Sequence, residues 1–505
     1  MEYRGLPRVI AGPAVLAISL LAAASLHAKP VTIVVDTEPD QLDPCQIDKS
    51  QVGPVIKSNV IETLTEIDPF DGTVLPRLAT EWVRLDATTW QFDLRGGVTF
   101  HDGSPLTAEA VAVSMRRTLV PELSCESALK YFAAIKLTAE PVDDDTVRFT
   151  TDIPVEILPT MMASVGISSL ATPLNEITRA PIGTGPYVLS EWVPGQRVVL
   201  SAYPGYWGGP AEVTGATYVW RQDSAVRAAM VAAGEADIAP RIAVQDATDG
   251  SMDFAYSNAV TTSFRIDGAI APLDDVRVRR AANLAIDRDA LRGTLFSAEA
   301  IPAAQQVPPG ATGYNPELTP YAFDPGEARR LLAAARADGA PVDTEIVLIG
   351  RYNIYSNAEE VVQAVQAMLA DVGFKTSIKM TDSAEWFKLA LKPFAEGRAP
   401  NIFQTGHDNT MGDAVFTVPA KYASTERQAT MTVPELDRLI AEASVASGEE
   451  RRAKFAEALR MIHEDIVPDI ILFHMVEFAR VNPRITYVPN VSTGTALQLR
   501  QISFK

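Results

Sequence analysis

The stretch TWQFDLRGGVTFHDGSPLTAEAVAVSMRR, residues 89–117, decides the fold. Its first six residues alternate between apolar and polar side chains, as in a half-buried strand, and the alternation resumes at residues 98–100 after a Gly-Gly turn. The run HDGSP at residues 101–105 breaks the backbone, and Thr107 can cap a helix that carries apolar residues at helical spacing. The stretch therefore predicts strands, a turn and a helix in close succession, without any catalytic grouping.

Length and charge narrow the class of protein. At 505 residues the chain exceeds the size that one hydrophobic core supports, so two or three lobes are expected. Its composition, 47% hydrophobic and 21% charged, is that of a globular protein. A formal net charge of -19 repels nucleic acid and anionic lipid surfaces, so we expect neither as a partner.

The N-terminus resembles an export signal. Residues 1–28 begin with two arginines, continue with an apolar run over residues 9–24, and offer a cleavage site after Ala28. The apolar run is short and interrupted for a membrane span, and no cysteine stands at the cleavage point, as a lipoprotein would require. The sequence therefore predicts a secreted, soluble mature protein, which in a Gram-negative host is periplasmic.

The chain has two cysteines, Cys45 and Cys125. In an oxidising compartment they can pair, closing a loop of about 80 residues that would stabilise the fold by roughly 4 kcal/mol in the chain-entropy model. The alternative is two unpaired thiols, one or both of them buried. The sequence leaves both possibilities open, because it does not give the distance between the two residues.

Strands and helices intermix along the whole chain, which predicts an α/β or mixed α+β class. Helix starts are marked at Asp324, with Pro and Glu in the following turn, and by an expected capping box at residues 447–450. We find no internal repeat, low-complexity segment or Gly/Ser linker. Lobes without a linker suggest that strands cross between them.

Further motifs stand in order along the chain: LPRLATEW at 75–82, GTGPY at 183–187, YPGYWGG at 203–209, DVRVRRA at 275–281 and AIDR at 285–288. Together with residues 89–117, they resemble the bacterial extracellular solute-binding proteins of family 5, the peptide- and nickel-binding group that feeds ABC importers. The resemblance implies a pear-shaped, two-lobed, periplasmic-binding-protein-like fold with an extra subdomain in the first lobe. The boundaries it implies are 29–263 plus 482–505 for lobe I, about 66–187 for the subdomain, 264–481 for lobe II, and crossings near 263–266 and 480–483.

The resemblance also indicates where a ligand would bind. In dipeptide-binding relatives, an Arg in a strand-to-helix loop binds the ligand carboxylate, and an Asp some fifty residues later binds its amine. Arg351 and Asp408 occupy these places, with Gly406, His407 and Asn409 in the same loop as the Asp. A guanidinium offers a planar fork to a carboxylate, and a closed, dry cleft strengthens such pairs.

The second loop departs from the pattern of those relatives, which carry a Trp near the position of Gly406. Its register against them is therefore open. Arg351 has the alternative of a surface or interlobe salt bridge, and Asp408 that of a turn-forming residue. His407 would matter most for a ligand that bears a metal. Trp386 lies on an amphipathic stretch and is interpreted as a core residue.

The motifs of enzymes are missing from the sequence. His101 and Asp102 lack the further His and Asp residues of a metal-dependent phosphohydrolase, and the Gly-Thr-Gly at residues 183–185 lacks the third glycine of a dinucleotide site. There is no P-loop, nucleophile elbow or zinc-protease motif. We therefore expect no enzymatic activity, no cofactor and no metal site.

The sequence thus predicts a monomeric periplasmic receptor that encloses short peptides between two lobes and delivers them to the permease subunits of an ABC importer. Within the same family, a nickel chelate, an opine, glutathione or an oligosaccharide remains an alternative ligand. A secreted hydrolase and a chaperone-like binder of unfolded chains are alternatives of other classes.

Overall fold

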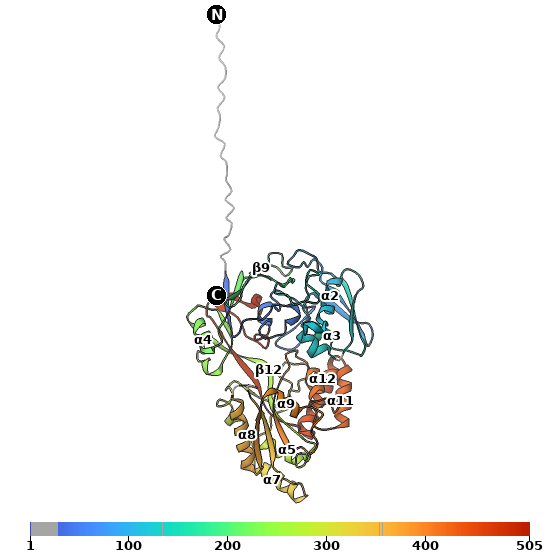
Figure 1. Ribbon diagram of the computed structural model, residues 1–505, viewed down its shortest axis with the longest axis vertical. Helices are drawn as coiled ribbons and strands as arrows, with labels where there is room; N and C mark the ends of the chain where they lie inside the picture. Colours follow the sequence, from blue (N-terminus) through green and yellow to red (C-terminus); the bar gives the residue numbers. More distant parts are fainter. Residues whose placement is uncertain (2–28, 134, 353, 356) are drawn as a thin grey trace.

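One mixed sheet of 11 strands runs through both lobes of the molecule. The structure is a computed structural model that describes residue 1 and residues 29–133, 135–352, 354–355 and 357–505, so that the expected export signal lies outside the described residues apart from Met1. Figure 1 shows the first lobe above the second, with β12 passing between them. The sheet order is β15-β14-β16-β12-β17-β11-β1-β10-β9-β8, and β13 pairs with β17.

The strands divide by lobe. The part of the sheet in the first lobe consists of β1 (Pro30–Val35), β8 (Tyr187–Val193), β9 (Arg197–Ala202), β10 (Gly215–Trp220) and β11 (Ile238–Ile242). The part in the second lobe consists of β13 (Ile301–Pro302), β14 (Ile346–Arg351), β15 (Thr376–Thr381) and β16 (Asn401–Asp408). The two long strands between them are β12 (Asp253–Ile266) and β17 (Asp469–Val481). Smaller sheets are formed by β2 (Thr65–Ile67) with β3 (Val74–Pro76), and by β18 (Ile485–Thr486) with β19 (Ser503–Phe504).

The helices divide in the same way. Those of the first lobe are α1 (Gly53–Ile56), α2 (Ala108–Thr118), α3 (Leu158–Met161) and α4 (Ser224–Ala232). Those of the second are α5 (Val276–Leu284), α6 (Arg288–Leu291), α7 (Pro325–Ala337), α8 (Ala358–Val372), α9 (Ser383–Ala390), α10 (Val418–Tyr422), α11 (Pro434–Val445) and α12 (Gly448–Arg460). Single π-helical segments lie at Ala128–Phe132 and Met461–Ile466. Short 3-10 segments lie at Pro44–Gln46, Pro121–Leu123, Met162–Ser164, Val244–Asp246, Ala414–Phe416 and Leu499–Gln501.

The opening stretch of sequence builds a subdomain of the first lobe. A four-stranded antiparallel sheet has the order β4-β5-β7-β6, with β4 (Ala79–Arg84), β5 (Thr89–Leu94), β6 (Leu137–Pro141) and β7 (Thr146–Thr151). Burial alternates along β5 as predicted, and the Thr107 hydroxyl accepts a hydrogen bond from the Ala110 N–H at the start of α2. Val98 and Phe100 are buried, but they flank an isolated bridge at Thr99 and do not form a second strand. The stretch therefore anchors a separate core, in which Phe92, Phe100 and Phe149 are buried together.

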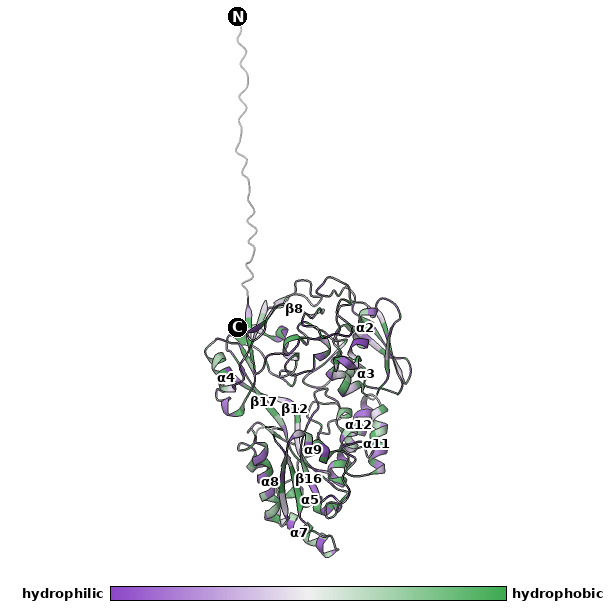
Figure 2. Cartoon of the chain, viewed as in Figure 1, coloured by the Kyte–Doolittle hydropathy of each residue, from purple (hydrophilic) through white to green (hydrophobic). Residues whose placement is uncertain are grey.

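Two expected helix starts have different outcomes. Asp324 caps α7 by accepting from the Glu327 N–H at 2.9 Å, as predicted. α12 begins directly after Ser447, as predicted, but the predicted capping box at residues 447–450 is wrong, because the Ser447 side chain makes no capping hydrogen bond. In Figure 2, α8 and α11 carry both hydrophilic and hydrophobic residues, as expected of helices with one buried face, and Val361, Val362, Val365 and Leu369 of α8 are buried.

The two long strands belong to both lobes. Residues 253–257 of β12 pair with residues 476–480 of β17, next to β11 in the first lobe. Residues 260–266 of β12 pair with β16 in the second lobe. Between these two parts the register shifts, and the buried Ala259 has a φ of 61°. A bulge of this kind bends a strand locally, and here it lies where β12 passes from one lobe to the other.

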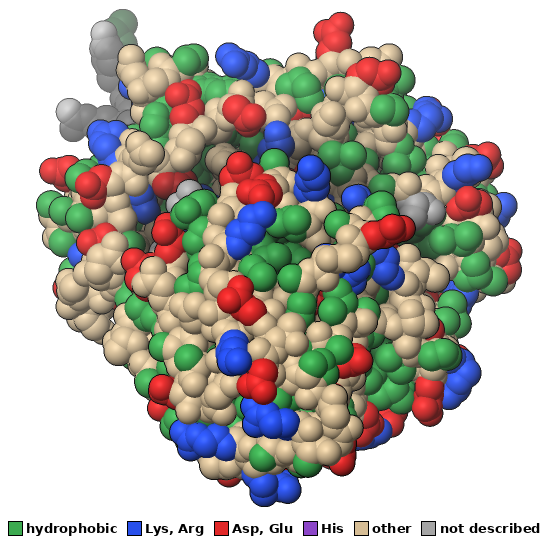
Figure 3. Space-filling view, turned by 60° about the horizontal axis from the view of Figure 1, so that its bottom comes forward, with side chains coloured by type: hydrophobic (Ala, Val, Ile, Leu, Met, Phe, Trp, Pro, Cys, Tyr) green, Lys and Arg blue, Asp and Glu red, His purple; other side chains and the backbone are tan. Residues whose placement is uncertain are grey.

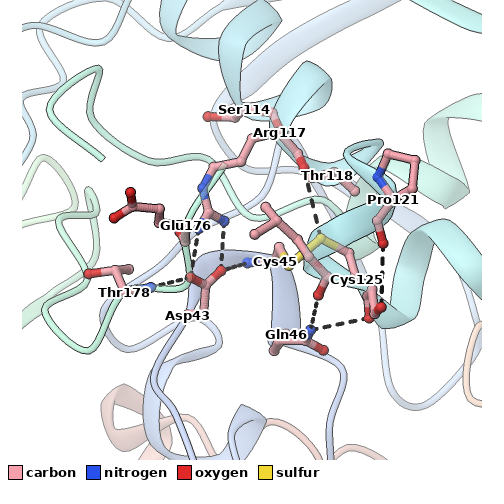
Figure 4. The surroundings of a disulfide bond; sticks show 12 residues. Asp43, Cys45, Gln46, Ser114, Arg117, Thr118, Pro121, Cys125, Glu176 and Thr178 are labelled. Carbon is pink, nitrogen blue, oxygen red and sulfur yellow. Dashed lines mark hydrogen bonds and ion pairs between the residues drawn. A yellow bond between two sulfur atoms is a disulfide. The ribbon is translucent and has the colours of Figure 1, made fainter. Parts of the chain in front are cut away.

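A disulfide fixes the N-terminal segment to the subdomain. Cys45 and Cys125 are bonded, with their Cα atoms 5.2 Å apart. Figure 4 shows Asp43 and Arg117 beside them, pointing toward each other. The buried Arg117 donates from two nitrogens to the Asp43 carboxylate, at 2.6 and 2.7 Å, and Asp43 also accepts from the Thr178 N–H. The bond and the ion pair together join the segment before α1, α2 and the loop that precedes β8.

Candidate functional site

A cavity of about 280 Å³ lies where the two lobes meet. The first lobe contributes residues 67–72 and the segment 489–492, and the second lobe contributes residues 308–311 and 409–412. The bulge of β12, through Tyr256, Ser257 and Ala259, forms another part of the wall. Because its walls come from both lobes and from a connecting strand, the shape of this cavity depends on how the lobes are arranged.

The lobes contact each other through glycines beside this cavity. A Cβ atom on Gly72 would lie 2.9 Å from the carbonyl oxygens of both Gly310 and Gly412. The three residues have φ values of 73°, 86° and 65°, a conformation that glycine adopts at little cost. The first lobe therefore meets the second backbone to backbone at this point, and no side chain of an L-residue fits at position 72.

A second interlobe contact is aromatic. Tyr131, in the π-helical segment at Ala128–Phe132, packs edge to face against Phe416 of the second lobe, with ring centroids 5.1 Å apart. Burial raises the pKa of Tyr131 well above its ordinary value, and the charges of Asp48 and Asp408 add to this. Burial works to lower the pKa of Lys130, but its hydrogen bond to Glu126 and the charge of Asp408 help to raise it overall. The charge of Asp408 thus acts on the pKa values of Lys130 and Tyr131 across the interface.

Arg351 ends β14 and has polar groups without partners. Its guanidinium carbon lies 5.3 Å from the ring centroid of Trp386 and 5.7 Å from that of Phe387, both on α9. Its Nε is buried without a hydrogen-bond partner among the described residues, and the same holds for Nε1 of Trp386. Burial lowers the pKa of Arg351. In the described part of the chain Arg351 forms no ion pair, so two neighbouring N–H donors are left for an incoming acceptor.

Arg351 and Asp408 come from neighbouring parallel strands. Ile349 of β14 is level with Phe403 of β16, so Arg351 is level with Thr405 by extension of the register. Asp408 lies three residues further along β16, which is about 10 Å at roughly 3.3 Å per residue. Both residues therefore lie toward the C-terminal ends of their strands, and the odd offset of three residues places their side chains on opposite faces of the sheet.

The other predicted residues have different surroundings. Gly406 is exposed, and a Cβ there would meet only Ile354 and Val260 at ordinary contact distances of 3.6 and 3.8 Å. His407 Nε2 lies 2.8 Å from the Thr417 hydroxyl, and burial first, then the charge of Lys421, lowers its pKa well below the ordinary value. His407 is therefore neutral and is engaged with its own lobe.

Asn409 closes the loop that carries Asp408. Its side-chain amide donates to the Asp413 carbonyl at 2.9 Å and to the Thr417 hydroxyl at 2.8 Å, and its carbonyl oxygen accepts from the Asp413 N–H. Asn409 also lines the interlobe cavity, whereas Arg351, Gly406, His407 and Asp408 do not. The predicted residues thus lie at the ends of β14 and β16 and in the loop that follows β16. Only Asn409 among them borders this cavity.

Some interface residues were missed from the sequence. Tyr131 and Phe416 lie outside every motif, and only the structure shows that they pack against each other. Trp386, interpreted as a core residue, is indeed buried with Ile349 and Phe403, although its Nε1 remains without a partner. The amphipathic pattern at residues 384–389 indicated the burial, but it gave no sign of the free donor.

The turn at His101 and Asp102 is structural. His101 Nε2 lies 2.9 Å from the Gly185 carbonyl, and the Asp102 carboxylate accepts from Ser104 and Ser169. Burial lowers the pKa of His101. Among the residues that the structure describes, no group of three His, Cys, Asp or Glu side chains is arranged to hold a metal ion. Nor does any helix in the described ranges combine the length and the hydropathy needed to cross a bilayer.

Comparisons with known proteins agree with this architecture. The family model described as bacterial extracellular solute-binding proteins, family 5 Middle, matches residues 73–428. Heme-binding protein A of Haemophilus influenzae is 27% identical over 464 residues, covering 84% of this chain and 83% of that protein. A probable di/tripeptide-binding protein 5 of Pseudomonas aeruginosa is 29% identical over 484 residues, covering 88% of this chain and 90% of its own.

A solved structure shares the fold. The structure of HbpA2 from Haemophilus parasuis has a TM-score of 0.83 at 22% identity, and the match covers 94% of this chain and 100% of the other. The mixed α/β, two-lobed fold expected from the sequence is confirmed.

Proposed function

The chain belongs to the bacterial extracellular solute-binding proteins of family 5, as its motifs predicted, and from this membership we propose that it is the periplasmic receptor of an ABC importer for short peptides. The peptide is enclosed between the lobes, and its higher affinity for the closed arrangement drives closure. The closed receptor then docks on the permease subunits in the inner membrane. It acts as a monomer and catalyses no reaction of its own.

One observation carries the choice of ligand class. Arg351 offers a guanidinium whose Nε, like the Nε1 of the neighbouring Trp386, has no hydrogen-bond partner among the described residues. Buried donors without acceptors are costly, so an anionic group of the ligand would satisfy both. A peptide carboxylate has the charge and the planar shape that suit a guanidinium.

The distance to Asp408 supports a short peptide. An extended chain advances about 3.3–3.6 Å per residue, so the offset of about 10 Å between the levels of the two residues corresponds to two or three residues. Asp408 provides an acceptor for the amino terminus at one end, while Arg351 holds the carboxylate at the other. Gly406, between them along β16, is exposed and leaves room for a side chain of the ligand.

The relatives alone do not select this ligand, because two of similar identity are named for heme and for di- or tripeptides. A nickel chelate, an opine, glutathione and an oligosaccharide are the other candidates. A ligand with a metal is less favoured here, since the Nε2 of His407 is engaged by the Thr417 hydroxyl. An oligosaccharide provides no carboxylate for Arg351.

Nucleic acid is not a partner on this proposal. Figure 3 shows Lys and Arg interspersed with Asp and Glu on the face where the second lobe comes forward, without a basic patch there. The net charge of -19 also repels the phosphates of nucleic acid. Of the alternatives from other classes, a hydrolase would need paired titratable groups in a pocket, and a chaperone-like binder would bind unfolded chains without saturation by a small solute.

Calorimetry on the purified mature protein tests the proposal. Dipeptides and tripeptides are compared with heme, nickel plus histidine, glutathione and an opine. We expect saturable binding of free peptides, with one site per chain. Tight binding of heme or of a nickel chelate, without any binding of peptides, would reject the proposed ligand class.

A further inference from the structure

A small cavity inside the second lobe is bordered by two buried cations, Arg265 and Lys421. It measures about 20 Å³, enough for one occupant the size of a water molecule. The remaining wall is mostly apolar and includes Met431, Leu436 and Ile466. None of its lining residues borders the interlobe cavity, and none is among the residues assigned to the proposed peptide site.

Both cations lack part of their normal coordination. The Arg265 side chain, 3% exposed, donates from its terminal nitrogens to the carbonyls of Gln428 and Ala390, whereas its Nε has no partner in the part of the chain that the structure describes. Lys421 is 4% exposed, and its ammonium makes no hydrogen bond or ion pair with a described residue. Buried charged groups are normally paired and fully hydrogen-bonded, and here Arg265 and Lys421 border the same cavity, each with a donor that has no acceptor among the described residues.

The nearby carboxylates do not balance the two charges. Asp469 is opposite Arg265 on β17, but its Oδ2 accepts from the Tyr422 hydroxyl at 2.6 Å, and it forms no ion pair with either cation. Asp267 is held by Arg398 at 2.7 Å. His407, next to Lys421, is neutral because burial lowers its pKa.

Two cations thus face one carboxylate, which leaves one positive charge in excess. Burial lowers the pKa of Lys421 to about 8, although the charge of Asp469 opposes this. Lys421 therefore remains mostly protonated at neutral pH. A water molecule in the cavity would supply an acceptor, but it would leave the excess charge unbalanced.

We propose that this cavity is a binding site for a single monovalent anion of halide size, held by the Lys421 ammonium and the Arg265 Nε–H. The anion completes the coordination of both donors and balances the charge of the cluster. The small volume excludes phosphate, sulfate and carboxylates of the solute class. The site stabilises the second lobe and does not depend on the peptide.

Bromide identifies the occupant directly. Crystals of the mature protein are grown in sodium bromide, and anomalous differences are measured above the bromine absorption edge. We expect an anomalous peak in the cavity within about 3.5 Å of both the Lys421 Nζ and the Arg265 Nε. A cavity that is empty, or that holds density without an anomalous signal, would overturn the proposal.

Thermal unfolding provides a second test with a matched control. Sodium chloride is compared with sodium gluconate at equal ionic strength. The midpoint of the wild-type protein should rise by about 3 °C when the chloride concentration is ten times its dissociation constant. Lys421→Met should lose this rise, and Lys375→Met, which removes the same charge from an exposed position, should retain it. If Lys421→Met does not fold, the bromide experiment on the wild-type protein still shows whether an anion occupies the cavity.

Discussion

Glu62 and Arg77 form an ion pair at the centre of the first lobe, with 2.7 Å between Oε1 and Nε. The carboxylate is buried and also accepts from the Tyr206 hydroxyl, the Trp207 indole and the Thr184 hydroxyl, each at 2.9 Å. Burial works to lower the pKa of Arg77, but the charges of Glu62 and Glu66 raise it overall. One carboxylate therefore connects three sequence motifs, at residues 75–82, 183–187 and 203–209.

Glu62→Gln tests how much the buried Glu62 carboxylate contributes to the stability of the protein. The substitution keeps the shape of the side chain but removes the charge, which leaves Arg77 buried with only Glu66 as a partner. We expect the free energy of unfolding to fall by about 3 kcal/mol, since breaking a buried pair leaves a charge uncompensated. Urea denaturation measures this. The exposed Glu81→Gln serves as the control, and equal small losses for both variants would show that the Glu62 carboxylate is not important for stability.

Part of the fold follows from the sequence because it depends on local pattern. The alternation in β5 and the cap of α2 were predicted correctly, and so was the two-lobed class. The contacts of the buried Glu62 carboxylate were not predicted, since no sequence pattern distinguishes Glu62 from an exposed glutamate. The motifs could be recognised, but their common partner is set by packing between residues more than a hundred positions apart.

The same limit applies to the candidate site. The roles of Arg351 and Asp408 are predicted from resemblance to relatives, and not from a local pattern. Their surroundings depend on tertiary structure: the aromatic rings beside Arg351 are on α9, and the charge of Asp408 acts on Lys130 of the other lobe. Likewise, the close approach of Gly72 to Gly310 and Gly412 depends on how the two lobes meet, which no local pattern encodes.

Gly72→Ala tests that interlobe contact. The added methyl would overlap two carbonyl oxygens of the second lobe, so we expect the lobes to separate and the radius of gyration in small-angle X-ray scattering to increase. The control is Gly234→Ala, which has a similar φ of 77° but nothing within 4 Å of the added atom. Both variants should lose about 1–2 kcal/mol from backbone strain. A Gly72→Ala protein with unchanged scattering would contradict the expected separation.

Reduction of the disulfide should destabilise the first lobe. The bond between Cys45 and Cys125 closes a loop of 80 residues, and the chain-entropy model gives a loss of roughly 4 kcal/mol when such a loop is opened. Guanidinium unfolding with and without a reductant measures the effect. The double variant Cys45→Ser/Cys125→Ser should unfold like the reduced protein and should not respond to the reductant. An unchanged wild-type transition under reducing conditions would disprove this stabilisation.

His474 should make the protein less stable in acid. Burial lowers its pKa to about 4 in the folded state, while its Nδ1 lies 2.8 Å from the Thr261 hydroxyl. An unfolded chain binds the proton near pH 6.5, so the unfolded state takes up more protons as the pH falls from about 6.5 to about 4. The free energy of unfolding should therefore decrease by roughly 3 kcal/mol over this window.

Urea unfolding at pH 7 and at pH 4.5 measures this decrease. The variant His474→Gln lacks the titrating group, and its stability should fall by correspondingly less over the same window. Parallel pH profiles for the two proteins would assign the acid sensitivity to other groups.

The two ends of the peptide site can be tested separately. Asp408→Asn should weaken the binding of a free tripeptide by about ten- to a hundredfold, as expected for the loss of a charge-assisted hydrogen bond. It should have little effect on the N-acetylated tripeptide, which lacks the ammonium. Arg351→Gln should show the opposite selectivity, with a large loss for the free carboxylate and little change for the C-terminal amide.

Calorimetry compares the wild-type protein, Asp408→Asn and Arg351→Gln, each with the free, the N-acetylated and the C-amidated tripeptide. The differences give the coupling energy between each side chain and the end of the peptide that it contacts. The exposed Arg330→Gln and Asp338→Asn variants control for the removal of the same charges at distant positions. Equal losses for the free and the blocked peptides would mean that the two residues act on the fold of the cleft and do not contact the ends of the ligand. If each variant loses affinity only for peptides in which the matching end is free, the direction of the peptide is fixed. Its amino terminus then lies at the end of β16 and its carboxylate lies against α9.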